Sequence, residues 1–301
     1  MKNFIQASTR FHYLLVGLAL FFLAFSLAVF AKPVSVADDR GVVVTFDAPP
    51  QRIISLLPSL TESICALGKC ANLVGIDRFS NWPKSIQDLP KLGGMGDINL
   101  ERIVQLKPDV VLLEKASPVI TRLNDLGIKT FALDVKSMED EERALKKLDL
   151  VLGTSESARV WNQIQQEITR ANKQLNLDGK TLRVYFEVNP APFAAGRSSF
   201  IGEIMTRLGL TNIIPESLGP FPKINPEFVV QSKPDLILLS ESTATDIQKR
   251  PGWNTIPAVS KNRICTFNAQ QNDVLVRPGP RMGEAAFIIS QCIQEKMSSS
   301  R

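Results

Sequence analysis

The sequence predicts an α/β protein with two Rossmann-like lobes, whose mostly parallel sheets are joined by a long rigid α-helix. The main observation is a repeat: N-L-E-R-I-V-Q-L-K-P-D-V-V-L-L at 99–113 returns as N-P-E-F-V-V-Q-S-K-P-D-L-I-L-L at 225–239. Each copy has the pattern of a short helix, a break at Lys-Pro and a buried strand, because Pro cannot continue a helix. One unit repeated at so long a separation indicates two lobes of similar construction rather than a solenoid.

A second pair of matching segments supports this division. T-E-S-I-C-A-L-G contains Glu62 and Gly68, and G-E-I-M-T-R-L-G contains Glu203 and Gly209 at the same spacing. Each is typical of a helix with an acid near its start and a Gly at its end. Two-lobed proteins usually bind a ligand in the cleft between the lobes.

Residues 1–31 are predicted to be an export signal, which would place the mature protein in the periplasm. Lys2 and Arg10 give a basic start, an apolar run follows to Phe30, and small residues surround Ala31. An uncleaved membrane anchor is the alternative. The chain carries a net charge of +5, of which Lys2 and Arg10 supply two, and it has no basic run that indicates nucleic acid binding.

The four cysteines all follow the predicted signal. An even number in an oxidising compartment favours disulfides, and four cysteines allow three pairings. Proximity in the sequence and the division into lobes favour Cys65–Cys70 and Cys265–Cys292, with free buried thiols as the alternative. The only His is His12, within the signal, so the rest of the chain has no Ser-His-Asp triad, Cys-His pair or His-based metal site. We expect no cofactor, no metal site and no enzymatic activity.

The N-terminal lobe is assigned to 32–153. It begins with a strand or hairpin at 41–46, and Ser59 and Glu62 fit a capping box at the start of its first helix. Its other predicted elements are strands at 52–57, 73–76 and 130–133, the first repeat copy, and helices at 118–126 and 137–152.

The linking helix is assigned to 154–178. Val160, Ile164, Ile168 and Leu175 recur there at helical spacing, and no Gly-rich hinge interrupts it. The C-terminal lobe, 179–301, is predicted to contain a strand at 182–188, a helix at 200–208, the second repeat copy, a strand at 264–267, and a last helix that ends near Lys296.

Ligands of open parallel sheets bind beyond the carboxyl ends of the strands. The candidate ligand-binding residues are those in the predicted loops at these ends: Pro58, Ser59, Phe79, Trp82, Gly94, Met95, Phe193, Phe221, Asp273 and Arg277. The aromatic side chains suit a flat, partly apolar ligand, or else they pack against their own loops. Asp273 and Arg277, in a predicted loop, either orient a ligand or pair with each other.

Four segments carry a resemblance to a known family: R-I-I-S-L-L-P-S-L-T-E, F-S-N-W-P, N-L-E-R-I-V-Q-L-K-P-D and the closing R-P-G-P-R. The chain resembles the periplasmic substrate-binding proteins of the cobalamin and iron-siderophore class, over nearly all of the sequence after the signal. The resemblance implies a monomer that captures a small-molecule ligand and delivers it to an ABC transporter permease. It also implies that Trp82, Phe193 and Phe221 line the ligand.

The resemblance further implies that Asp273 and Arg277 contact the ligand. Glu62 and Glu203, one on each lobe, would meet arginines of the permease. Cobalamin-binding members of the class have a Trp after the first repeat's strand, where this chain has Glu114-Lys115. Haem, an iron chelate or another corrinoid therefore stays open as the ligand.

Two other classes of protein are alternatives. The first is an exported two-lobed transferase, but no phosphate-binding Gly motif follows a strand and opens a helix, and the sequence after the predicted signal lacks His, the commonest general base. The second is an envelope interaction protein with a vestigial cleft.

Overall fold

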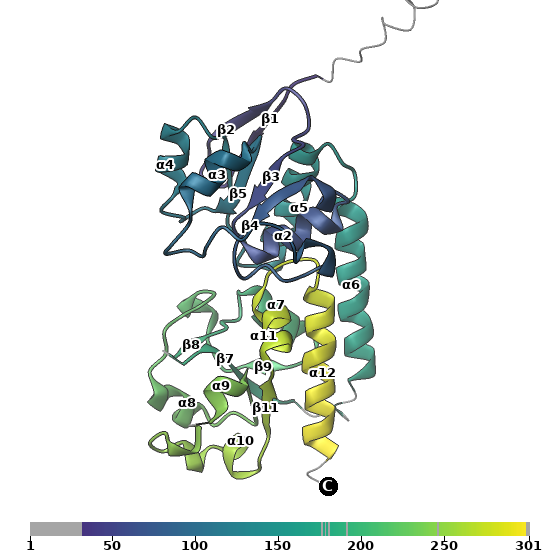
Figure 1. Ribbon diagram of the computed structural model, residues 1–301. Coiled ribbons are helices and arrows are strands. Elements are labelled where there is room, and N and C mark those ends of the chain that lie inside the picture. The colour runs from purple at the N-terminus through teal and green to yellow at the C-terminus, as the bar shows by residue number, and fades with distance from the viewer. Residues whose placement is uncertain are drawn as a thin grey trace, which may run out of the picture.

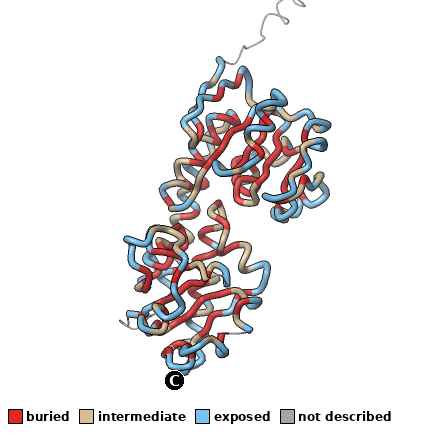
Figure 2. Tube along the Cα trace, turned by 90° about the vertical axis from the view of Figure 1, so that its left-hand side faces the viewer, coloured by how far each residue is buried: buried red, intermediate tan, exposed pale blue. Residues whose placement is uncertain are grey.

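The computed structural model describes residues 32–298, except 176, 178, 180, 191 and 246. The predicted export signal, 1–31, lies outside the described residues. Two α/β lobes are stacked end to end beside two long helices, and buried segments run through the middle of each lobe (Figures 1 and 2). Among the described residues, no helix combines the length and apolar character needed to cross a bilayer.

The N-terminal lobe has a parallel sheet of four strands in the order β4-β3-β5-β6. A separate antiparallel hairpin, β1 (Val34–Ala37) and β2 (Val43–Phe46), confirms the strand or hairpin predicted at 41–46. The other elements in chain order are β3 (Ile53–Ser55), α2 (Pro58–Ala66), β4 (Leu73–Ile76), α3 (Leu100–Leu106), β5 (Val110–Glu114), α4 (Ile120–Asp125), β6 (Thr130–Leu133) and α5 (Met138–Leu152).

The C-terminal lobe has a sheet in the order β11-β10-β7-β8, with β9 also beside β7. Only β8 runs antiparallel, so both main sheets are mostly parallel, as predicted. The elements are β7 (Arg183–Asn189), β8 (Phe193–Ala194), α7 (Phe200–Arg207), β9 (Thr211–Asn212), α8 (Pro226–Ser232), β10 (Leu236–Ser240), α9 (Glu241–Ala244), α10 (Pro257–Ser260), β11 (Ile264–Phe267), α11 (Ala269–Val276) and α12 (Met282–Ser298).

The two sequence repeats fold alike down to single residues. α3 and α8 begin at Asn caps, and each ends at a lysine, Lys107 or Lys233, in the left-handed region at φ 45°. The Asp of each Lys-Pro-Asp then accepts backbone hydrogen bonds where the neighbouring strand begins. Asp109 accepts from Arg52 N at 2.8 Å and Asp235 accepts from Arg183 N at 3.0 Å. In each lobe the repeat thus forms a short helix, the turn that ends it and the strand that follows, and its Asp links that strand to the neighbouring one.

The lobes share one apolar core along α6 (Ser157–Gln174). Val160, Ile164 and Ile168 belong to a buried cluster that extends from Ile53 in the first sheet to Leu236 in the second. α12 lies alongside α6 (Figure 1). The two helices approach closely at Gly283, where a Cβ atom would lie 2.2 Å from a Glu167 side-chain oxygen.

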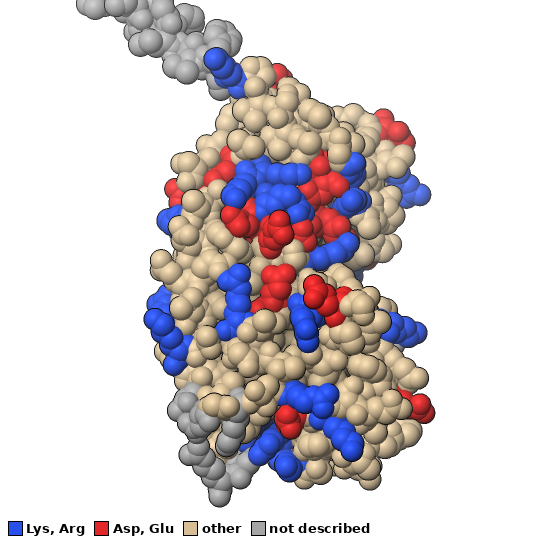
Figure 3. Space-filling model, turned by 180° about the vertical axis from the view of Figure 1, so that it is seen from behind, with Lys and Arg blue, Asp and Glu red and all other residues tan. Residues whose placement is uncertain are grey.

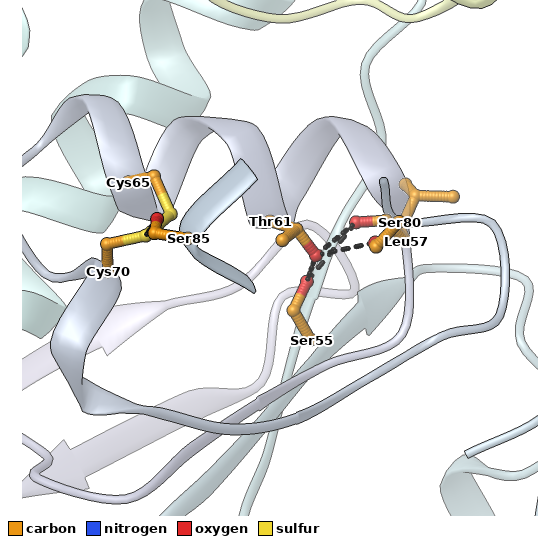
Figure 4. The surroundings of a disulfide bond; sticks show 7 residues. All are labelled: Ser55, Leu57, Thr61, Cys65, Cys70, Ser80 and Ser85. Carbon is orange, nitrogen blue, oxygen red and sulfur yellow. Dashed lines mark hydrogen bonds between the residues drawn. A yellow bond between two sulfur atoms is a disulfide. The ribbon is translucent and has the colours of Figure 1, made fainter. Parts of the chain in front are cut away.

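Both predicted disulfides are confirmed. Cys65–Cys70 closes the end of α2, with a Cα–Cα distance of 4.1 Å (Figure 4). Cys265–Cys292 joins β11 to α12, with a Cα–Cα distance of 5.9 Å. The second bridge ties the last strand to α12, the helix that lies against α6.

Two local expectations are wrong. The predicted capping box of Ser59 and Glu62 does not form, because α2 begins at Pro58 and its cap, Leu57, lies two residues before Ser59. The predicted loop that holds Asp273 is helix α11, which opens with a capping box of Asn268 and Gln271. That N-x-x-Q pattern was the available signal for this helix.

Candidate functional site

A groove between the lobes brings together six of the ten candidate ligand-binding residues. Its main pocket has a volume of about 450 Å³. The six residues are Pro58, Ser59 and Phe79 from the N-terminal lobe, and Phe221, Asp273 and Arg277 from the C-terminal lobe. Viewed from behind, the outline of the molecule is notched between the lobes (Figure 3).

A second pocket adjoins the first and enlarges the groove. It has a volume of about 560 Å³, shares Pro58 and Phe79 with the main pocket, and adds Gly94 and Met95. Phe79 is 59% exposed and Met95 is 65% exposed, which is unusual for large apolar side chains. Exposed apolar side chains beside a concave surface favour contact with a partly apolar ligand.

The loop that carries Phe79 is held by buried hydrogen bonds. Asp77 Oδ1 accepts from the backbone N–H of Phe79 at 2.7 Å and of Ser80 at 3.1 Å. The Ser80 hydroxyl lies 2.9 Å from that of Thr61, which donates to Ser55 at 2.8 Å (Figure 4). Burial raises the pKa of Asp77 above its ordinary value, although these hydrogen bonds oppose the shift. The loop is therefore anchored to α2 and β3, while the ring of Phe79 faces outward.

Phe221 is held from the other lobe. Its ring lies 6.0 Å from that of Phe200, centroid to centroid. The loop that carries Phe221 passes close to Gly196. A Cβ atom on Gly196 would lie 2.1 Å from Gly219 O, so only glycine fits there. Phe193, in β8, is half-buried and lines neither pocket of the groove.

Trp82 lies apart from the other aromatic candidates. It is 40% exposed, and the guanidinium of Arg281 stacks over it at 4.9 Å. It lines a different pocket, of about 530 Å³, together with Asn81 and Asp273. Trp82 and Phe79 therefore line different pockets, which share Asp273.

Arg277 is the centre of a polar junction between the lobes. Its guanidinium donates to Glu62 Oε1 at 2.9 Å, to Asn81 Oδ1 at 2.8 Å and to Phe79 O at 3.1 Å. It also pairs with Asp273 at 2.8 Å, so these two candidates contact each other. Arg277 both lines the groove and fixes the Phe79 loop against the C-terminal lobe.

The two acids expected to dock on a permease contact the opposite lobe instead. Glu62 is only 1% exposed, and its oxygens accept from Arg277 and also from Arg281, at 2.7 and 2.9 Å. Glu203 is half-buried and accepts from Met138 N at 3.2 Å. Burial raises the pKa of Glu203 above its ordinary value. Neither carboxylate is presented openly to solvent in this structure, and their expected role in docking on a permease stays a prediction.

Three charged residues of the groove were not among the candidates. Glu114, Asp134 and Lys136 line the main pocket, and Lys136 pairs with Asp134 at 2.9 Å. The hydrogen bond to Asp134 raises the pKa of Lys136. Glu114 is the last residue of β5, and Asp134 and Lys136 follow the end of β6, so the rule that ligands bind beyond the carboxyl ends of strands was the available signal.

Another charged cluster lies outside the groove. The face seen in Figure 3 carries adjacent blue and red side chains over the N-terminal lobe. In the N-terminal lobe, Asp39 pairs with Arg143 at 3.1 Å and with Lys147 at 2.7 Å. These interleaved charges satisfy each other and join the β1–β2 hairpin to α5.

Comparison with known proteins gives consistent matches. The family model described as "Periplasmic binding protein" matches residues 53–270. An uncharacterized ABC transporter substrate-binding lipoprotein of Bacillus subtilis is 28% identical over 275 residues, which are 87% of this chain and 85% of that protein. A vitamin B12-binding protein of Pectobacterium carotovorum is 30% identical over 245 residues, which are 79% of this chain and 87% of that protein.

A solved structure agrees in fold. The periplasmic heme-binding protein RhuT from a Roseiflexus species, in its apo form, superposes with a TM-score of 0.69. The match covers 82% of this chain and 98% of that chain, at 24% sequence identity. At this identity the likeness supports the two-lobed architecture alone.

Proposed function

Because the chain belongs to the periplasmic binding protein family, we propose that it captures cobalamin or a related metal chelate in the groove between its lobes. The chelate is then delivered to an ABC import permease. The family binds solutes rather than transforming them, so the transferase alternative is set aside. The basic and apolar segment at 1–31 supports export to the periplasm.

The observation that carries this proposal is the composition of the groove. Phe79 and Phe221 line it from opposite lobes, together with Leu57 and Pro58 at the start of α2, and charged side chains also line it. Such a site suits a broad ligand with an apolar face and a polar rim. A corrin ring surrounded by amide side chains has this shape and chemistry.

Haem is the second candidate, because the fold matches a haem-binding protein. Protein side chains hold haem iron through His, Tyr, Cys or Met. The chain has one His, at position 12, its cysteines form disulfides, and Tyr185 is fully buried. Among the described residues that line the groove, only Met95 offers such a ligand. Cobalamin needs none, because its cobalt carries its own axial ligands, and this favours the corrinoid.

We propose that the permease docks on two acids of the sequence repeat, Glu101 and Glu227, rather than on Glu62 and Glu203. Glu101 and Glu227 occupy equivalent positions in the first turns of α3 and α8. Both are exposed, and within the described part of the chain neither forms an ion pair. α3 and α8 lie on the side of the molecule away from α6 and α12 (Figure 1). One accessible acid on each lobe would pair with basic residues of a permease and so fix the orientation of the binding protein on it.

A binding panel tests the proposed ligand. The purified protein is incubated with cyanocobalamin, haemin or a ferric hydroxamate, separated from free ligand by gel filtration, and read by visible absorbance. We expect cyanocobalamin to co-elute with the protein. Retention of haemin alone would support the second candidate, and retention of none of the three would contradict the proposal.

A further inference from the structure

The main pocket of the groove contains five ionisable side chains, and four of them are paired. Lys136 pairs with Asp134 at 2.9 Å, and Arg277 pairs with Asp273 at 2.8 Å. The fifth is Glu114, the last residue of β5. In the part of the chain that the structure describes, its carboxylate forms neither an ion pair nor a hydrogen bond.

A ligand in the main pocket would lie close to the negative charge of Glu114. It is half-buried, and it lines the same pocket as Phe79 and Phe221. Charges interact more strongly beside a protein surface than in bulk water, because the effective dielectric constant is lower. A lone carboxylate accepts hydrogen bonds from N–H groups and repels other carboxylates.

The two cations of the main pocket, Lys136 and Arg277, are already paired with other carboxylates, so they leave the negative charge of Glu114 without an ion-pair partner. Lys136 pairs with Asp134, and the nearby charge of Glu114 also raises the pKa of Lys136. Arg277 pairs with Asp273 and with Glu62 of the lobe junction. A ligand carboxylate would therefore meet an unpaired negative charge and no free positive charge. A ligand amide would instead donate a hydrogen bond to Glu114.

On the basis of the function proposed above, we propose that Glu114 makes the groove selective for chelates with uncharged, amide-bearing edges. Chelates with ionised carboxylates at the same edge are rejected. The peripheral amides of a corrin belong to the first class, and the propionates of haem belong to the second. The equivalent residue of the second repeat is Ser240, so the selection is made by the N-terminal lobe alone.

A minimal change in one ligand tests this selectivity. Hydrolysis of a single peripheral amide converts cyanocobalamin into its monocarboxylic acids, which are separated as isomers and titrated by calorimetry. The wild-type protein, at neutral pH, is expected to bind cyanocobalamin roughly tenfold or more tightly than the isomer whose carboxylate faces Glu114. Glu114→Gln keeps the shape of the side chain and is expected to reduce that preference to about twofold or less.

The control is Asp125→Asn, which removes the same charge from an exposed site on α4 and is expected to keep the full preference. If wild type and Glu114→Gln discriminate equally, or if wild type binds every isomer as tightly as cyanocobalamin, the role of Glu114 is overturned while the proposed function stands. If the wild-type protein binds no corrinoid, the proposed function itself is contradicted, and this inference falls with it.

Discussion

Glu62 of the N-terminal lobe and Arg277 of the C-terminal lobe form an ion pair at 2.9 Å, with side chains only 1% and 9% exposed. Arg281 pairs with the same carboxylate at 2.7 Å. The lobes are thus fixed to each other by buried charges directly beside the groove, as well as by the shared apolar core along α6.

Replacement of Glu62 is expected to destabilise the protein strongly. Glu62→Gln leaves two arginines without their shared charge partner in a buried setting, which costs about 3 kcal/mol of unfolding free energy. Urea denaturation at neutral pH measures this loss. The control, Glu142→Gln, removes an exposed ion pair with Lys146 and is expected to cost less than about 1 kcal/mol. Equal losses in the two variants would mean that the Glu62 junction contributes no more than a surface pair.

The two disulfides are expected to differ in their effect on stability. Cys265–Cys292 spans 27 residues and Cys65–Cys70 spans 5, so the former restricts the unfolded chain more. From loop entropy, paired Cys→Ala replacement costs about 3.5 kcal/mol for the long loop and about 2 kcal/mol for the short one. Thermal or urea unfolding of the two double variants tests the order. A larger loss for the short loop would show that contacts, rather than loop entropy, set these effects.

Glu141 on α5 is expected to give the stability a specific pH dependence. Burial raises the pKa of its carboxyl well above the ordinary 4.5, the charge of Glu62 adds to the shift, and a hydrogen bond from Ser63 opposes it. The folded protein therefore holds this proton more tightly than the unfolded chain, and stability falls as pH rises from about 4.5 towards the folded-state pKa.

The variant Glu141→Gln has no such proton to lose. Its unfolding free energy is expected to decrease less than that of wild type between about pH 5 and about pH 8, because the penalty of ionising a buried carboxyl is gone. Denaturation curves at both pH values measure this difference. Identical pH profiles for the two proteins would mean that Glu141 does not titrate differently in the folded state.

Charge reversal at Glu101 and Glu227 is expected to abolish uptake and leave ligand affinity unchanged. Glu101→Lys and Glu227→Lys place a positive charge against the basic residues of the proposed permease contact. Cellular uptake and solution titration are measured in parallel, with Glu142→Lys on α5 as the control. Normal uptake by the folded double variant would remove these acids from the docking surface.

Much of the fold follows from local sequence, because the signals are local. The Lys-Pro-Asp repeats mark the breaks between α3 and β5 and between α8 and β10. Proximity in the sequence and the division into lobes favour the two disulfides that form. Phe79 and Phe221 are candidate ligand-binding residues because both lie in loops expected at the carboxyl ends of the strands.

The lobe junction could not be predicted in this way. Glu62 meets its arginines from 215 and 219 residues away, and nothing local distinguishes this contact from a helix cap. The position of Trp82 also depends on tertiary contacts, since Arg281 holds its ring outside the main groove. Such long-range pairings are set by the packing of the lobes rather than by local propensity.

The most direct test of the proposed function is calorimetric titration of the purified protein with cyanocobalamin, before and after removal of the groove's aromatic rings. We predict one bound molecule per chain, and a loss of about 1–3 kcal/mol of binding free energy, or roughly 5- to 150-fold in affinity, for each of Phe79→Ala and Phe221→Ala. Leu126→Ala, which removes an exposed apolar side chain outside the groove, is expected to bind as wild type does. Absence of binding to wild type, or equal affinity in all four proteins, would contradict the assignment of the groove as a corrinoid site.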